Sequence, residues 1–101
     1  TGLMSSRPLE KLLAYRITDE VVAELRAAHR AGRRLFIGTQ NMFTHRLVVW
    51  DVGAVADSDR PDAVELVRKV LLAACSIPGV VPPVEFDVVV NGHHFKELHA
   101  D

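Results

Sequence analysis

The chain has 101 residues, of which 49% are hydrophobic and 25% are charged, and its formal net charge is −1. This length allows one domain at most, and the composition is that of a globular protein rather than a disordered one. A net charge so close to zero provides no basic field for nucleic acid and no polybasic run for anionic lipid. We therefore expect no nucleic-acid partner.

The cysteine count and the hydropathy exclude further classes. Cys75 is the single cysteine, so the chain cannot form an internal disulfide, and we expect its side chain to be a small buried filler at a helix end. No apolar stretch approaches the roughly 20 residues that span a bilayer, and the first residues do not have the pattern of a signal peptide. This favours a cytoplasmic or membrane-peripheral location.

The first third of the chain predicts two helices. Pro8 to about Tyr15 forms the first, because proline suits a first turn and its leucines share one face. Thr18 is a good N-cap for the second, which carries two acidic residues in its first turn. Gly32 is the expected stop after this helix.

Two strands and a long helix are predicted next. The apolar run within Arg34–Thr39 predicts a strand buried on both faces, and Leu47–Trp50 predicts a second strand whose tryptophan lies in the core or at an interface. The segment Gly53–Arg60 has the polar composition of a surface loop. Asp59 is then expected to cap a helix from Pro61 to about Cys75, which must end before Pro78.

The last part of the chain predicts a hairpin. Phe86–Val90 is rich in strand-forming residues, Asn91-Gly92 is typical of a two-residue type I′ turn, and His94–Leu98 is the expected return strand. The succession of helices and strands predicts an α/β fold containing part of a mixed sheet.

Several segments carry a more specific pattern through their order and spacing. They are Gly38-Thr39-Gln40-Asn41-Met42, Val48 to Ala54, Leu71 to Gly79, Pro82-Pro83-Val84, and Glu97 to Asp101. In this order they resemble the C-terminal half of the catalytic domain of patatin-like phospholipases. That family has a strand of Ala-Thr-Asn-Leu type, a small-residue helix end, a Phe-Pro-Pro-Val turn and an Asp-Gly-Gly or Asp-Gly-Ala motif. Val81 departs from the pattern, because the family has an aromatic residue there.

The resemblance implies a fold and a site. Residues 1–101 would be a single, partial patatin-like domain with three α/β/α layers around a mixed sheet, incomplete in this chain. Asp101 would be the catalytic general base of a Ser–Asp dyad, and the nucleophilic serine and glycine-rich oxyanion loop would precede the present sequence. Both ends of the sequence look cut, and the missing half of the same domain would be a partner.

The chemistry of a Ser–Asp dyad predicts whether the chain alone could hydrolyse an ester. A serine hydroxyl is a poor nucleophile until a base accepts its proton, and a carboxylate in direct hydrogen-bond reach can be that base. The chain has four serines: Ser5, Ser6, Ser58 and Ser76. None of them lies in the Gly-x-Ser-x-Gly context of the family's nucleophile. We therefore expect the chain alone to be inactive and the whole enzyme to cleave lipid or other acyl esters without metal or cofactor.

Two alternatives remain open. The chain could be a non-catalytic α/β domain that binds another protein, and its apolar strands also make self-association possible. It could instead be a separate α/β enzyme that uses His93, His94 and His99. No paired Cys/His spacing of a zinc site occurs, so we expect these histidines to be surface or half-buried side chains.

Overall fold

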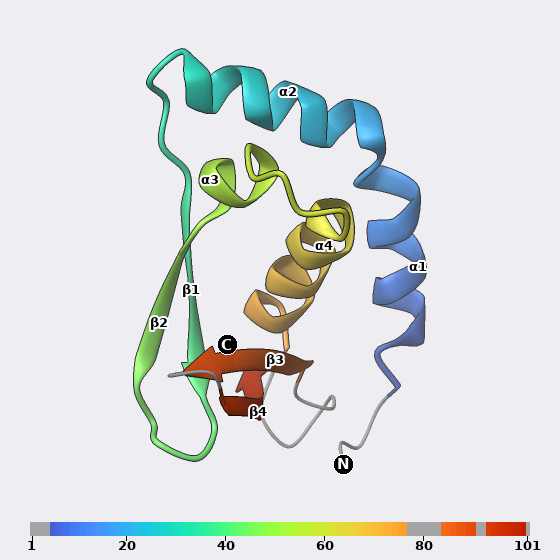
Figure 1. The fold of residues 1–101 in the computed structure, drawn as a ribbon. Coiled ribbons are helices and arrows are strands. Elements are labelled where there is room, and N and C mark those ends of the chain that lie inside the picture. The colour runs from blue at the N-terminus through green and yellow to red at the C-terminus, as the bar shows by residue number, and fades with distance from the viewer. Residues whose placement is uncertain (1–4, 77–83, 91–92, 101) are drawn as a thin grey trace.

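The structure is a computed structural model that describes residues 5–76, 84–90 and 93–100. It contains helices and a four-stranded antiparallel sheet, which confirms a mixed α/β chain (Figure 1). The elements are α1 (Arg7–Arg16), α2 (Asp19–Arg30), β1 (Phe36–Asn41), β2 (Leu47–Asp51), α3 (Val52–Ala56), α4 (Ala63–Ala74), β3 (Val84–Val90) and β4 (His93–Ala100).

The first two helices form as their end signals predict. Pro8 lies in the first turn of α1, where its missing amide hydrogen costs no helical hydrogen bond. The Thr18 hydroxyl accepts the Val21 amide hydrogen at 3.4 Å and caps α2. Gly32 follows this helix with a φ of +93°, a left-handed conformation that glycine adopts without steric cost.

The segment between β2 and α4 differs from the predicted loop. Residues Val52–Ala56 form the short helix α3, and the Asp51 carboxylate accepts the Ala54 amide hydrogen at 3.0 Å as its cap. Asp59 does not cap the next helix: α4 begins after Asp62, whose side chain makes no capping bond. Helix α3 was not predicted because the small residues here lack the spacing of an amphipathic helix.

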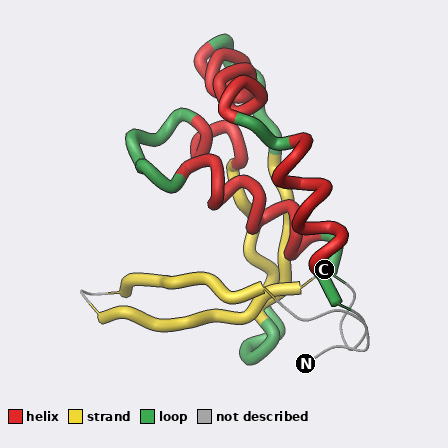
Figure 2. Tube along the Cα trace, turned by 90° about the vertical axis from the view of Figure 1, so that its right-hand side faces the viewer, coloured by secondary structure: helices red, strands yellow, loops and turns green. Residues whose placement is uncertain are grey.

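The sheet consists of two hairpins that meet at a corner. The strand order is β2-β1-β4-β3 and every described pairing is antiparallel, so the mixed sheet that was predicted is not what these strands form. Strands β1 and β4 share two register pairs, Gln40 with Ala100 and Asn41 with His99. The β3–β4 hairpin therefore projects away from the β1–β2 hairpin (Figure 2).

The core lies between α4 and the sheet. Helix α4 buries Val67 and Val70, which lie on one face with Ala63 and Ala73. Trp50 and Phe86 pack into the same core from the sheet, with ring centroids 4.8 Å apart. Helices α3 and α4 thus cover one face of the β1–β2 hairpin (Figure 1).

The opposite face of this hairpin is exposed. Phe36, Leu47 and Val49 retain 58%, 70% and 58% of their accessible surface. The prediction of a strand buried on both faces was therefore wrong for β1, because no described element covers this side. A second helical layer, which a three-layer fold requires, does not occur among residues 5–76, 84–90 and 93–100.

Candidate functional site

The predicted catalytic residue, Asp101, lies outside the described residues. The strand that leads to it is described: β4 ends at Ala100, which is 1% exposed and pairs with Gln40 of β1. Because β4 lies between β1 and β3, this end of the strand belongs to the interior of the sheet. The last residues before Asp101 are thus held by β1 on one side and, at His99, by β3 on the other.

A buried polar chain lies directly beside this strand end. His99 places Nδ1 2.7 Å from the Thr39 hydroxyl oxygen and Nε2 3.0 Å from a Glu97 carboxylate oxygen. Trp50 Nε1 donates to the same Thr39 oxygen at 2.8 Å. The chain Trp50–Thr39–His99–Glu97 therefore joins three strands through their side chains, and we name it the β1–β4 polar chain.

Strand periodicity brings these residues to one face. Glu97 and His99 are two residues apart on β4, so their side chains point to the same side. Thr39 pairs with Val48, which makes Trp50 its diagonal neighbour, close enough for a long side chain to reach. No local sequence pattern indicates this set of hydrogen bonds, because Thr39 and His99 are 60 positions apart in the sequence.

Aromatic rings pack against His99 in the polar chain. The His99 ring lies edge-on to Phe86 and Trp50, at centroid distances of 5.1 and 5.9 Å. Thr39 and His99 are each 1% exposed, whereas the Glu97 side chain keeps 30% of its surface. The prediction of a surface or half-buried histidine was therefore wrong for His99.

The other histidine predictions fall on residues without described side chains. His93 and His94 lie in β4, but their side chains are outside the described set. Within the described part of the chain, no group of three or more His, Cys, Asp or Glu side chains could hold a metal ion. The histidine-based alternative therefore stays a prediction.

The hydroxyl groups of the described serines bond to groups within four residues along the chain. Ser76 is buried and donates to the Leu72 carbonyl at 2.8 Å, and Ser58 donates to the Val55 carbonyl at 2.6 Å. Ser6 donates to the Glu10 carboxylate at 2.9 Å, but this exposed pair lies at the start of α1, four residues apart. Ser5 accepts the Arg7 amide hydrogen.

Cys75 is exposed, which corrects its expected burial. It is the C-cap residue of α4, and the buried positions of this helix recur at Val67, Val70 and Ala73. Residue 75 falls outside that spacing, so its side chain leaves the packed face.

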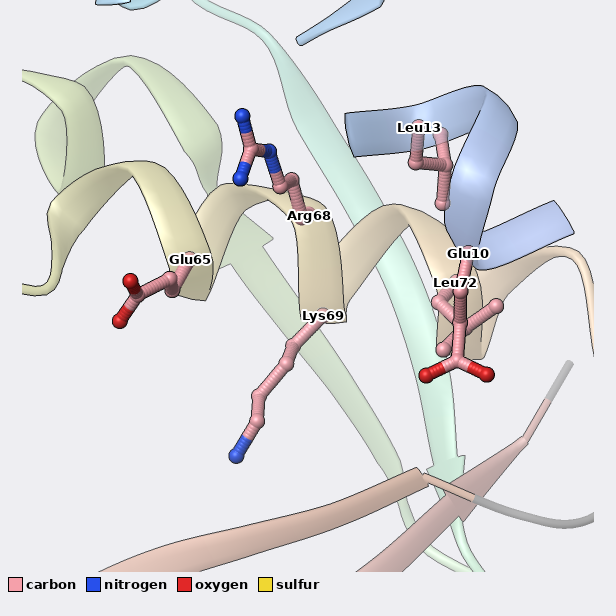
Figure 3. Close-up of a pocket in the computed structure, with 6 residues that line it drawn as sticks. All are labelled: Glu10, Leu13, Glu65, Arg68, Lys69 and Leu72. Carbon is pink, nitrogen blue, oxygen red and sulfur yellow. The ribbon is translucent and has the colours of Figure 1, made fainter. Parts of the chain in front are cut away.

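A groove with a volume of about 220 Å³ runs between α1 and α4 (Figure 3). Its lining residues are Glu10, Leu13, Glu65, Arg68, Lys69 and Leu72. Arg68 donates to the Ile17 carbonyl at 2.8 Å, and Lys69 donates to the Glu85 carbonyl at 3.2 Å. Arg68 thus ties α4 to the end of α1, and Lys69 ties α4 to β3.

A second charged cluster joins α2 to the end of α3. Asp57 accepts from His29 Nδ1 at 3.1 Å and from Arg30 Nε at 2.8 Å. The His29 hydrogen bond, together with the bond and charge of Arg30, lowers the pKa of Asp57 despite partial burial. The cluster holds two helices together and contains no nucleophile.

Comparison with protein-family models, curated proteins and solved structures found no match for this chain. The described residues contain no helix that is both long and apolar enough to cross a membrane.

Proposed function

We propose that residues 1–101 are part of a patatin-like serine lipid acyl hydrolase. Asp101 is its general base, and the nucleophilic serine and oxyanion loop lie outside this sequence. The substrate is a phospholipid or a related acyl ester, cleaved through an acyl-serine intermediate. The protein acts without metal or cofactor, in the cytoplasm or at a membrane surface.

One observation carries the proposal: the chain reaches Asp101 from the buried end of an internal strand. Ala100 and His99 are each 1% exposed, and their strand lies between β1 and β3. A carboxylate that removes the serine proton directly must be kept within hydrogen-bond distance of the nucleophile. The end of a buried strand supplies the rigid support that such a base needs.

The uncovered face of β1–β2 supports the placement in a larger domain. Phe36, Leu47 and Val49 form an exposed apolar surface, and β2 is an edge strand with one side unpaired by any described strand. Exposed apolar surface of this kind marks a contact site. The remaining strands and helical layer of a three-layer domain would cover it.

The same surface favours a second candidate, a non-catalytic α/β domain that binds another protein. Activity distinguishes the two. The purified 101-residue chain should show no esterase activity in either case, whereas the full-length protein should hydrolyse acyl esters only if the first proposal is correct.

The decisive experiment is Asp101→Asn in the full-length protein. An amide is isosteric but has no comparably basic oxygen, so kcat should fall by about 10²–10⁴-fold while the melting temperature stays unchanged. Asp59→Asn, at an exposed carboxylate in the loop before α4, is the control and should retain activity. Turnover within a few-fold of wild type in Asp101→Asn would refute the assignment.

A further inference from the structure

The outer edge of β2 carries backbone groups that no described strand pairs. Ladder bonds to the β1 side reach the Arg46 carbonyl and the Val52 amide. Because the bonded residues of an antiparallel ladder alternate, Leu47, Val49 and Asp51 direct their amides and carbonyls away from β1. Strand β2 is the first in the order β2-β1-β4-β3 and lies at one margin of the molecule (Figure 1). Among the described residues, this edge is open to a further strand.

The edge of β2 lacks the features by which proteins keep an exposed strand from pairing. Such strands usually carry a lysine, a proline or a bulge. Residues Leu47–Asp51 contain neither lysine nor proline, and they pair with β1 at five consecutive positions without a bulge. Leu47 and Val49 are also exposed and apolar. A regular strand without these features favours pairing with another strand.

We propose that this edge pairs with the same edge of a second copy of the chain, about a two-fold axis at Val49. Two-fold symmetry makes the paired strands antiparallel and the contact self-complementary. Val49 then lies opposite Val49 of the second copy, and Leu47 lies opposite Asp51 of the second copy. Each pair exchanges two backbone hydrogen bonds, because both of its members point outward. No other register pairs all the outward residues of β2 with one another.

The charges at the ends of β2 favour the same arrangement. Arg46 precedes the strand and Asp51 ends it. In the proposed register Arg46 lies opposite Val52 of the second copy, next to its Asp51, so opposite charges approach at both ends of the contact. Parallel pairing would bring like charges together, which opposes association. The formal net charge of −1 adds little repulsion between the two copies.

The contact is small, so the dimer is weak. Two strands of five residues offer less surface than the roughly 800 Å² that each partner buries in a standard interface. The dimer should therefore dissociate on dilution. It uses the edge of the β1–β2 hairpin and leaves the exposed face free for the helical layer of the proposed function. The dimer does not depend on that function, because no reacting group takes part in the contact.

The first test is disulfide formation at single cysteines in the full-length protein, with Cys75 and any further exposed cysteine replaced by serine. Val49→Cys should form a disulfide dimer on oxidation, because its Cα atoms in the two copies would be about 5.5 Å apart, within disulfide range. In Leu47→Cys the two thiols belong to residues about 14 Å apart along the strands. Its yield should be at least about tenfold lower.

Equal yields at residues 47 and 49 would show random collision and overturn the proposed register. The absence of any disulfide dimer at residue 49, at concentrations up to the solubility limit, would overturn the contact itself.

The second test measures the dissociation constant of the dimer by analytical ultracentrifugation. Val49→Pro removes an outward amide and leaves the bonds between β1 and β2 in place, since proline is tolerated on edge strands when its nitrogen faces outward. Each copy loses one bond, so the dimer should dissociate at least about tenfold more readily. The cross-linking result does not involve this variant and remains decisive if the proline lowers stability.

Phe36→Thr is the control, because it removes an aromatic side chain from the exposed face and leaves the edge of β2 intact. Its dissociation constant should stay within about threefold of wild type. Loss of association in Phe36→Thr, with association retained in Val49→Pro, would overturn the edge-to-edge dimer and show that the apolar faces stack instead.

Discussion

Asp57 connects two helices through its partners on α2. His29 and Arg30 donate to its two oxygens, and the nearby Arg26 guanidinium donates to the Ala56 carbonyl at 3.0 Å. These bonds act together at the point where α3 ends. Asp57 is 28 positions from His29 and 27 from Arg30 in the sequence. These ion pairs therefore stabilise a tertiary contact between α2 and the end of α3.

The lowered pKa of Asp57 predicts a pH-dependent contribution to stability. The group's pKa is lower in the folded than in the unfolded state, so its stabilising effect is present above the unfolded value of about 3.9 and is lost as pH falls through the folded value. Asp57→Asn should lower the melting temperature near neutral pH, and the difference from wild type should shrink below about pH 4.

Asp59→Asn is the control for this measurement, because Asp59 is an exposed carboxylate in the same loop. Its melting temperature should follow that of wild type across the titration. A difference between wild type and Asp57→Asn that stays constant from pH 7 to pH 3 would contradict the ionic origin of the effect.

Among the elements, helices α2 and α4 differ in how they begin. Thr18 caps α2 through its hydroxyl, whereas Asp62 at the start of α4 makes no capping bond and pairs with Arg60 instead. The Arg60 hydrogen bond lowers the pKa of Asp62, but the pair is exposed, and such pairs contribute little to stability. Helix α4 depends more on its buried face.

This contrast predicts unequal costs for removing the two N-cap side chains. Thr18→Ala should lower the free energy of unfolding by about 1 kcal/mol, because the Val21 amide loses its partner. Asp62→Ala should change it by less than about 0.5 kcal/mol. Urea denaturation of both variants measures the difference, and a loss in Thr18→Ala as small as that expected for Asp62→Ala would show that the Thr18 hydroxyl does not cap α2 in solution.

In the molecule as a whole, the same residues of β2 have backbone groups at the open edge of the sheet and side chains on its exposed face. The Asn41 amide bonds to the Arg46 carbonyl and the Val52 amide to the Leu35 carbonyl. In an antiparallel ladder the bonded residues alternate, so the backbone groups of Leu47, Val49 and Asp51 point to the open edge. The side chains of Leu47 and Val49 are also the exposed apolar ones.

An edge strand with these properties predicts self-association of the isolated chain. Leu47→Lys places a charge on the edge and should shift the chain towards monomer, because lysine on an edge strand opposes further pairing. Analytical ultracentrifugation over a range of concentrations measures the shift. Leu12→Lys, at an exposed leucine of α1, is the matched control and should leave the association unchanged.

One result would contradict the prediction of self-association. If the wild-type chain is a monomer at every concentration and melts cooperatively, the β1–β2 surface does not drive association. The proposal that further strands and a helical layer cover this surface would then lose its support.

Sequence patterns alone predicted the elements whose signals lie close together in the chain. The Thr18 cap, the Gly32 stop and the spacing of valines in α4 each depend on residues within a few positions, so both α2 and α4 were predicted. Strand composition likewise located β1, β2 and most of β3. Helix α3 was missed, because its small residues carry no amphipathic pattern.

Three properties depend on the tertiary structure instead: which strands are neighbours, which face is covered and which polar groups meet. Thr39 and His99 become partners because β4 pairs with β1, a contact that no local pattern encodes. The same packing buries His99 and exposes Cys75 and Phe36, against the expectations from the sequence. Burial depends on what lies opposite a side chain, and that is fixed by distant parts of the chain.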